Sequence, residues 1–336
     1  MRHLVEEILS GNDLTEQQAR ELLTYLTDPE LDQVLAAAAL AGLRTKGEKP
    51  DELRGFAMGL RKLAVRPDIP SDAAAVDVVG TGGDGSGSLN LSTGSALVAA
   101  AAGAPVIKHG NRSISSQSGS ADVLTALGMG LPWDEAKVGK VFDSTGFTFL
   151  FAPTFHPAMK SIAPVRQALG VRTIFNLAGP LANPASPPFG VIGVFSLEVA
   201  GMMANTLADM PIERAFVVHG EPGWDEPTPV GPYQLFEVTP GSVVHTVEDP
   251  ADFGIARCDA ADLAGKDADF NAAELRRVLA GEAGPHRDAL LLGASLALRA
   301  TGLADGPMDA LSQSAAAIDS GGALALVDSL IETASV

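Results

Sequence analysis

The chain has 336 residues, of which 46% are hydrophobic and 19% charged, and its formal net charge is −18. This composition predicts a folded protein with a sizeable core, and the length suits one large domain with a smaller one. The negative charge argues against a nucleic-acid partner or an anionic membrane surface, and the single cysteine, Cys258, excludes an intrachain disulfide.

The first 66 residues show helical periodicity. Thr15 can cap one helix, Asp28-Pro29 predicts the start of a second, and Pro50 predicts the start of a third that ends near Leu63. Residues 67–71 then form a linker. The N-terminus has no apolar signal sequence, so we expect a cytoplasmic protein.

From residue 75 onward, predicted strands and helices alternate. We expect strands at 75–79, 105–109, 147–151, 190–195 and 214–219, an extended segment at 233–247, and helices at 95–102, 120–128, 133–144, 197–209, 271–280, 286–300, 307–319 and 322–333. Alternation of this kind predicts a mostly parallel sheet with helices on both faces.

The most informative segment joins the strand 75–79 to the helix that follows it. Glycine occupies five of the eight positions from Gly80 to Gly87, and Asn90, Ser92 and Thr93 come next. Glycines allow the backbone to approach a phosphate closely, and the free N–H groups of a helix start point toward its charge. The segment therefore predicts an anion-binding site.

Three kinds of phosphate ligand can be compared with this loop. Gly80, Gly82 and Gly85 fit the dinucleotide pattern G-x-G-x-x-G, which alone is a weak signal. A dinucleotide site also needs an acidic residue about 20 positions further on, where this chain has Lys108. A Walker A loop needs a Gly-Lys-Ser/Thr sequence that does not follow. A sugar phosphate or diphosphate remains, held by backbone amides, nearby hydroxyls and the lysine.

A second polar segment follows the strand 105–109. It begins with four polar side chains within five residues: Lys108, His109, Asn111 and Arg112. Capping of the next helix explains Ser120 and Asp122 as well as ligand binding does, but it does not explain those four. Open α/β sheets bind their ligands at this end of a strand.

These two segments resemble those of the anthranilate phosphoribosyltransferase family. The resemblance rests on Gly80–Thr93 and Lys108–Leu124, and it continues through 43–50, 149–160, 163–184, Val218-His219-Gly220 and Asp225-Glu226. The motifs follow the family's order and span most of the chain.

The resemblance implies an α/β fold of the nucleoside phosphorylase and phosphoribosyltransferase type. A small helical N-terminal domain, residues 1–66 with about 163–184, would join a large, mostly parallel-sheet α/β domain, residues 72–162 and 185–336. The active site would lie in the cleft between them, and the protein would form a homodimer.

The implied reaction transfers the phosphoribosyl group of phosphoribosyl pyrophosphate to the amine of anthranilate, in tryptophan biosynthesis, with Mg²⁺ on the leaving pyrophosphate. By the resemblance, the donor contacts Gly80, Thr81, Gly82, Gly83, Asp84, Asn90, Ser92, Thr93, Lys108 and Ser120. The acceptor contacts Gly82, His109, Asn111, His156 and Arg166, and the metal contacts Ser92, Asp225 and Glu226. No residue is assigned as a general base, because an aromatic amine attacks as the neutral base.

Three positions depart from the family pattern. After Asp225-Glu226 the family usually has a serine and a threonine, whereas this chain has two prolines early in the segment 227–233, which stiffen it. Gln117 stands where a basic residue is often found. The helix near Gly293 lacks the expected Asn-Ala start.

Three other hypotheses stay open at this point. A paralogue could use the same donor with another aromatic acceptor, a pyrimidine nucleoside phosphorylase shares the fold, and a non-catalytic relative could bind a partner in the same cleft. The Asn111-Arg112 pair and the Arg166 segment argue against the phosphorylase. The acidic composition and the complete set of loop and carboxylates argue against the non-catalytic relative.

Overall fold

Four helices build the N-terminal unit of the chain: α1 (Arg2–Leu9), α2 (Glu16–Leu26), α3 (Gln33–Lys46) and α4 (Pro50–Leu63). The computed structural model describes residues 1–112 and 117–335. Thr15 caps α2 as predicted, in a capping box with Gln18. The helix start predicted at Asp28 is wrong: Asp28 only closes a turn by accepting the N–H of Glu30, whereas the side chain of Asp32 accepts two N–H groups and begins α3.

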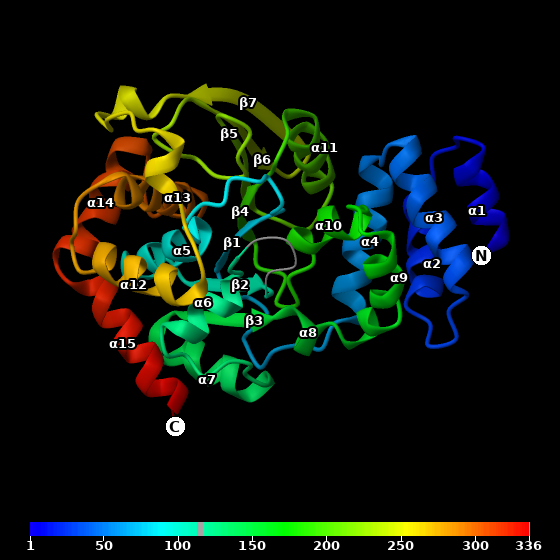
Figure 1. Cartoon of the computed structure of the whole chain (residues 1–336), viewed down its shortest axis with the longest axis horizontal. Helices are drawn as coiled ribbons and strands as arrows, with labels where there is room; N and C mark the ends of the chain where they lie inside the picture. Colours follow the sequence, from blue (N-terminus) through cyan, green and yellow to red (C-terminus); the bar gives the residue numbers. More distant parts are fainter. Residues whose placement is uncertain (113–116, 336) are drawn as a thin grey trace.

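In the described part of the chain, seven strands form one sheet in the order β3-β2-β1-β4-β5-β6-β7 (Figure 1). They are β1 (Val76–Gly80), β2 (Val106–Gly110), β3 (Phe147–Phe151), β4 (Phe189–Gly193), β5 (Arg214–Gly220), β6 (Tyr233–Thr239) and β7 (Ser242–Glu248). Strands β1 to β5 are parallel, as predicted, and β6 and β7 extend the sheet as an antiparallel hairpin. The carboxyl ends of the five parallel strands therefore share one edge.

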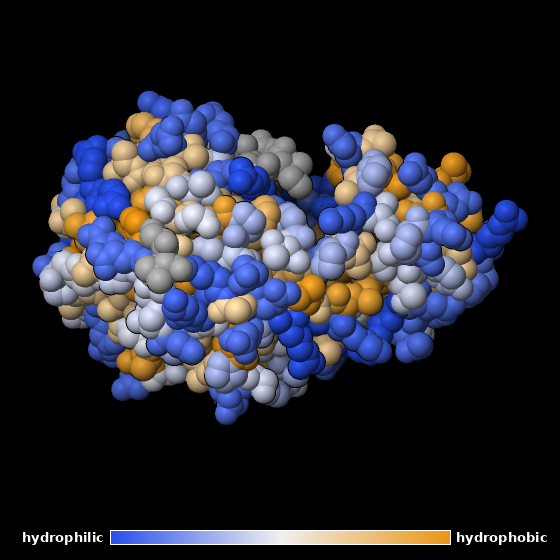
Figure 2. Space-filling view, turned by 90° about the horizontal axis from the view of Figure 1, so that it is seen from below, coloured by the Kyte–Doolittle hydropathy of each residue, from blue (hydrophilic) through white to orange (hydrophobic). Residues whose placement is uncertain are grey.

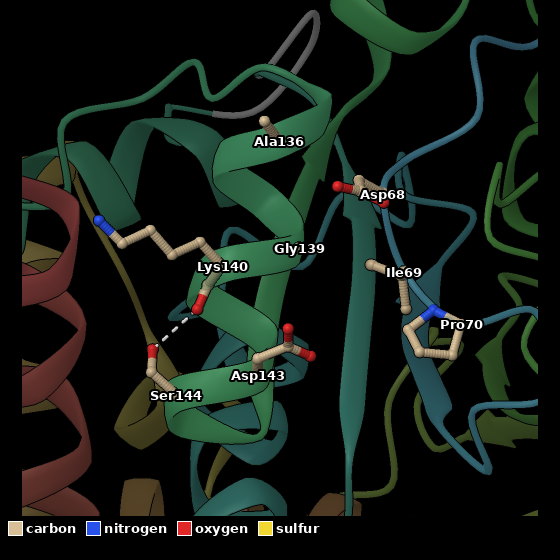
Figure 3. A pocket seen from close by; sticks show the side chains of 8 residues that line it. All are labelled: Asp68, Ile69, Pro70, Ala136, Gly139, Lys140, Asp143 and Ser144. Atoms are coloured by element: carbon tan, nitrogen blue, oxygen red, sulfur yellow. Dashed lines mark hydrogen bonds between the residues drawn. The ribbon is translucent and has the colours of Figure 1, made fainter.

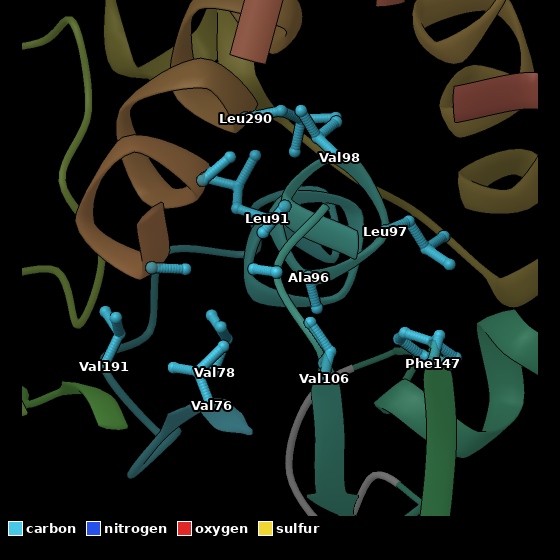
Figure 4. Packing of buried hydrophobic residues seen from close by; sticks show 14 of the residues in the cluster. Val76, Val78, Leu91, Ala96, Leu97, Val98, Val106, Phe147, Val191 and Leu290 are labelled. Carbon is cyan, nitrogen blue, oxygen red and sulfur yellow. The ribbon is translucent and has the colours of Figure 1, made fainter. Parts of the chain in front are cut away.

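Helices of the first half and the C-terminus cover one face of this sheet. They are α5 (Leu91–Ala101), α6 (Ser120–Ala126), α7 (Glu135–Thr145), α12 (Ala268–Leu279), α13 (Pro285–Ala300), α14 (Pro307–Asp319) and α15 (Gly322–Ser335). Figure 4 shows Leu91, Ala96 and Leu97 of α5 among buried residues of the strands, including Val78 and Val106. Helix α5 starts at Leu91, four residues before the predicted position.

Helices α5 and α13 cross at close range because both carry glycine at the contact. A Cβ on Gly94 would lie 2.6 Å from Leu290 Cδ2, and a Cβ on Gly293 would collide with the hydroxyl of Ser95. Backbones can approach this closely only where no side chain intervenes. The close packing explains why glycine occupies position 293, whereas the missing Asn-Ala start has no structural explanation.

The opposite face carries α11 (Leu197–Ala208) and a second hydrophobic cluster shared with the N-terminal helices. Three short helices of the central segment were not predicted individually: α8 (Ala152–Phe155), α9 (Ala163–Leu169) and α10 (Ile174–Ala178). Phe175 of α10 packs edge-on against Phe56 of α4, with ring centroids 5.4 Å apart. Segment 163–184 is therefore packed together with the N-terminal helices.

The surface divides into a larger and a smaller lobe, and Figure 2 shows a hollow between them on its upper side. Among the described residues, no single helix is long and apolar enough to cross a membrane. Only α14 and α15 together reach that length and composition, as a pair bent by 61°.

Candidate active site

The glycine-rich loop leaves β1 at the carboxyl edge of the sheet. The N–H of Thr81 donates to the Gly193 carbonyl at the end of β4, at 2.9 Å. Four glycines between Gly82 and Gly87 have positive φ angles of 62° to 75°, a conformation that glycine adopts at little cost. A Cβ on Gly80 would collide with the Asp225 carboxylate. The loop conformation and the closeness of Asp225 therefore both require glycine.

Two carboxylates reach this loop from the turn after β5. Asp225 Oδ2 accepts the N–H of Gly82 at 2.6 Å, and Glu226 Oε1 accepts the N–H of Ser92 at 3.0 Å. Asp84 of the loop accepts the N–H of Asp225 at 3.3 Å. The Asp225-Glu226 pair is therefore built into the loop, unlike a solvated acidic turn.

Burial and mutual repulsion act on these carboxyl groups. Burial, together with the nearby Asp84, raises the pKa of Asp225 to about 7. Burial and then Asp225 raise the pKa of Glu226 well above its usual range, and Lys108 opposes the shift. No three His, Cys, Asp or Glu side chains of the described residues form a metal-binding cluster. Crowded carboxylate oxygens suit a hard cation that takes its other ligands from substrate and water.

Lys108 lies beneath the loop. Its side chain is 1% exposed, and its Nζ donates to the Val78 carbonyl and lies 3.4 Å from Ser92 Oγ. Burial lowers the pKa of Lys108, and the charges of Asp77 and then of the two site carboxylates oppose this. Lys108 is thus a buried cation beneath the loop whose charge interacts with those of Asp77, Glu226 and Asp225.

The first turn of α5 carries the polar residues that follow the loop. Asn90 precedes the helix, and its Nδ2 donates to the Ser118 carbonyl at 3.0 Å. Ser92 faces Lys108 through its hydroxyl. Thr93 is fully buried. The N-terminus of α5 is therefore tied to the segment that precedes α6.

That segment folds back on the end of β2. Ser120 Oγ donates to the Asn111 carbonyl at 3.2 Å, and Asp122 accepts the N–H of Gly119 at 3.0 Å. Asp122 thus performs the capping that the sequence allowed, whereas Ser120 is the first residue of the helix. Residues 113–116 of the polar segment lie outside the described residues.

His109 faces away from Lys108, because successive residues of a strand point to opposite sides. Its ring centroid lies 5.1 Å from that of His156, which follows α8. Burial, with His156 as the second cause, lowers the pKa of His109 to about 3, and burial lowers that of His156 to about 4. Both imidazoles are neutral at pH 7. His156 stands between α8 and the short 3-10 helix 157–160, where its side chain makes no capping hydrogen bond.

Two arginines of the central segment differ in what they contact: Arg172 reaches the glycine loop, whereas Arg166 packs against Phe175 of α10. Arg166, in the last turn of α9, has its guanidinium 5.2 Å from the centroid of Phe175, and burial lowers its pKa. Arg172 stacks 3.7 Å from the centroid of Phe195 and donates to the Gly83 carbonyl. Arg172 was missed from the sequence: it lies within the segment 163–184, but nothing in its local pattern shows that it reaches the glycine loop.

The segment that departs from the family pattern after Glu226 is packed into the protein. Thr228 is 1% exposed, the Pro229 carbonyl accepts the N–H of Cys258 at 3.4 Å, and the Tyr233 hydroxyl donates to Glu248 at 2.7 Å. The prolines therefore belong to a buried turn that follows the carboxylate pair.

A separate hollow of about 710 Å³ lies between the linker and α7. Figure 3 shows Asp68, Ile69 and Pro70 on one side, with the Lys140 side chain pointing away from them. The predicted site residues do not line this hollow, and its polar groups do not converge as those of a ligand site do.

Comparisons with known proteins agree with this geometry. Two family models match the chain: "Glycosyl transferase family, helical bundle domain" over residues 2–64, and "Glycosyl transferase family, a/b domain" over residues 72–324. The anthranilate phosphoribosyltransferase of Desulforudis audaxviator is 43% identical over 332 residues, 99% of this chain and 96% of that protein. That of Anaeromyxobacter dehalogenans is 43% identical over 336 residues, 100% and 99% of the two chains.

Solved structures give the same result. The crystal structure of anthranilate phosphoribosyltransferase from Thermus thermophilus has a TM-score of 0.93 and 40% identity, covering 99% of both chains. The enzyme from Saccharomyces cerevisiae in complex with PRPP and Mg has a TM-score of 0.89 and 25% identity, covering 99% of this chain and 97% of that one.

Proposed function

The chain belongs to the anthranilate phosphoribosyltransferase family, and on that premise we propose which of its residues serve each part of the reaction. The enzyme transfers the phosphoribosyl group of phosphoribosyl pyrophosphate to anthranilate in tryptophan biosynthesis. The observation that carries the residue assignment is the glycine loop held against a buried carboxylate pair at the carboxyl edge of the sheet.

The glycine loop and the start of α5 bind the donor in this proposal. Loop amides with positive φ and the first N–H groups of a helix form a concave anion site. The contacts come from Gly80, Thr81, Gly82, Gly83, Asp84, Asn90, Ser92, Thr93, Lys108 and Ser120. Lys108 is buried, and its Nζ donates to the Val78 carbonyl and lies near Ser92 Oγ, so its charge acts from beneath the bound phosphoribosyl donor, close to Asp77 and the site carboxylates.

Asp225, Glu226 and the hydroxyl of Ser92 would hold Mg²⁺. These three metal ligands suit Mg²⁺, because two of them are carboxylates whose pKa values are raised by burial and by neighbouring carboxylates. A nearby cation would lower both pKa values. When bound, Mg²⁺ neutralises charge on the leaving pyrophosphate.

The acceptor lies against Gly82, His109, Asn111, His156 and Arg166. The planar guanidinium of Arg166 can donate two parallel hydrogen bonds to the anthranilate carboxylate. The neutral, buried imidazoles of His109 and His156 provide a flat surface of low charge beside an aromatic ring.

The chemistry needs positioning more than proton transfer. The bond between the ribose C1′ and the pyrophosphate oxygen breaks, a bond between C1′ and the anthranilate nitrogen forms, and the amine proton leaves to solvent. The protein holds the two reactants in line and stabilises the departing charge. No general base is assigned among the site residues.

The organisation of the molecule is part of the proposal. We place the site in the cleft between a helical domain, residues 1–66 with 163–184, and an α/β domain, residues 72–162 and 185–336. We also propose a homodimer through the helical domain, whose Leu9 and Val34 are 62% and 79% exposed, and a cytoplasmic location, which a single cysteine suits.

Arg166 provides the test that separates acceptor from donor. Arg166→Ala should raise the KM for anthranilate by about tenfold or more, because roughly 1.5–3 kcal/mol of charged hydrogen bonding is lost. Arg166→Lys should fall between this variant and the wild type, since a lysine keeps the charge but not the planar fork. The KM for phosphoribosyl pyrophosphate should change little.

The matched control is Arg257→Ala, which removes an arginine paired with Asp249 outside the proposed site. Steady-state kinetics with each substrate varied in turn measures all three variants. An anthranilate KM that stays at the wild-type value in Arg166→Ala removes this residue from the acceptor site.

A further inference from the structure

A buried amide on α12 reaches the start of α5. Asn271 is 1% exposed, and its Nδ2 donates to Asn90 Oδ1 at 2.9 Å. Its own Oδ1 accepts the N–H of Lys266 at 2.8 Å. Asn90 in turn donates through Nδ2 to the Ser118 carbonyl at 3.0 Å. Two side-chain amides therefore connect three segments that are far apart in the sequence.

We call this chain of hydrogen bonds, from Lys266 through Asn271 and Asn90 to Ser118, the amide relay. The backbone groups at its two ends determine which way each side-chain amide is oriented. The N–H of Lys266 can only donate, so the oxygen of Asn271 faces it and the nitrogen faces Asn90. The carbonyl of Ser118 can only accept, so the nitrogen of Asn90 faces it and the oxygen faces Asn271. Turning either amide over would place two donors or two acceptors against each other.

The segment that precedes α12 also supports the glycine loop. The N–H of Leu89 donates to the Leu263 carbonyl at 3.0 Å, and the N–H of Gly265 donates to the Gly87 carbonyl at 2.8 Å. A Cβ on Gly265 would lie 2.6 Å from the Ser88 carbonyl oxygen. The loop and the start of α5 are thus held by the same short segment, 263–271.

We propose that Asn271 is a positioning residue for phosphoribosyl pyrophosphate, acting through Asn90. This inference rests on the proposed donor site at the glycine loop and the start of α5. The relay uses one N–H and one lone pair of the Asn90 amide, which leaves the others for a ligand. Asn271 therefore determines which atoms of Asn90 face phosphoribosyl pyrophosphate. It also keeps the first turn of α5 at a fixed distance from Ser118.

The test replaces one atom of the relay. In Asn271→Asp an oxygen can still accept the N–H of Lys266, but the N–H group that donates to Asn90 Oδ1 is lost. The KM for phosphoribosyl pyrophosphate should rise about fivefold to tenfold, as expected for roughly one hydrogen bond, while the KM for anthranilate stays within about twofold. A purely structural residue would lower the amount of active enzyme without separating the two KM values.

A double-mutant cycle with Asn90→Ala locates the effect. The double variant should raise the donor KM no more than Asn90→Ala alone, because Asn271 acts through Asn90. Thr206→Val is the control: it removes a buried hydroxyl that donates to the Met202 carbonyl on α11, outside the proposed site, and should leave both KM values unchanged. Asn271→Ala provides the same test if the aspartate variant does not fold.

The outcomes separate the inference from the assignment on which it rests. A raised donor KM in Asn90→Ala with a wild-type value in both Asn271 variants overturns the positioning role alone. A wild-type donor KM in Asn90→Ala as well overturns the donor site itself. Additive effects in the double variant also overturn the relay.

Discussion

The buried charge of Lys108 yields the sharpest quantitative prediction. Its side chain is 1% exposed and faces the site carboxylates, so Lys108→Met removes a charge while keeping most of the volume. Lys108 is a buried cation whose charge acts on Asp77, Glu226 and Asp225, and a buried charge left without compensation costs about 3–5 kcal/mol. We therefore expect a large loss of stability in the protein without Mg²⁺ or donor.

This loss can be converted into a melting temperature. The entropy of unfolding per residue implies about 0.7 kcal/mol per kelvin for a chain of this length, so the expected drop is about 4–7 °C. Thermal unfolding without Mg²⁺ or substrate measures it, with Lys140→Met on the exposed side of α7 as the control. Adding Glu226→Gln to Lys108→Met should cost less than the sum of the single changes, because the unpaired carboxylate is gone.

The same variant also tests the position of Lys108 beneath the donor loop. The KM for phosphoribosyl pyrophosphate should rise more than the KM for anthranilate. Equal losses for both substrates would contradict the donor assignment. A melting temperature in Lys108→Met as high as that of Lys140→Met, or strictly additive effects with Glu226→Gln, would refute the argument that the lysine compensates the buried carboxylates.

Two further predictions follow from the carboxylates and from the histidine pair. The double variant Asp225→Asn/Glu226→Gln should lower kcat by about 100-fold or more, and excess Mg²⁺ should restore part of it; a wild-type kcat with unchanged Mg²⁺ dependence would show that the pair holds no metal. The lowered pKa of His156 contributes stability that is complete above pH 6.5 and is lost as the pH falls toward about 4. His156→Gln should therefore flatten the decline in stability between pH 7 and pH 4, by up to about 3 kcal/mol in urea unfolding, and parallel curves would contradict the burial argument.

Sequence patterns predicted most of the helices and strands, because the residues that form each pattern interact with neighbours only a few positions away. The helix starting at Pro50 has the predicted bounds, since its proline and acidic residues act within one turn. The start of α3 was misplaced because Asp28 and Asp32 are both good caps, and only the folded chain shows which one faces the helix. The short helices α9 and α10 are stabilised by packing against the N-terminal helices, which sequence periodicity over a few residues cannot show.

The candidate site shows a similar limit. The glycine run and the polar residues after β2 could be recognised in the sequence, because each group is contiguous in the chain. The charge interaction of Lys108 with Asp225 and Glu226 joins residues more than a hundred positions apart, so no window of sequence contains it. Arg172 and Asn271 were missed for the same reason: each acts on the loop through one tertiary contact.

The electrostatics of the site explain how an acidic protein can bind a polyanionic donor. A chain with a net charge of −18 could either gather free cations at the site or recruit metal ions. The first option is limited at the glycine loop, because Lys108 is buried among the charges of Asp77, Asp225 and Glu226. Asp84 adds another carboxylate, and Arg172 is a cation that reaches the loop from outside. Burial raises the pKa values of Asp225 and Glu226, and a divalent cation beside them would favour their charged forms and supply positive charge for the pyrophosphate. The donor is therefore expected to bind as its magnesium complex, and the raised pKa values of Asp225 and Glu226 reflect how strongly the protein alone lacks that positive charge.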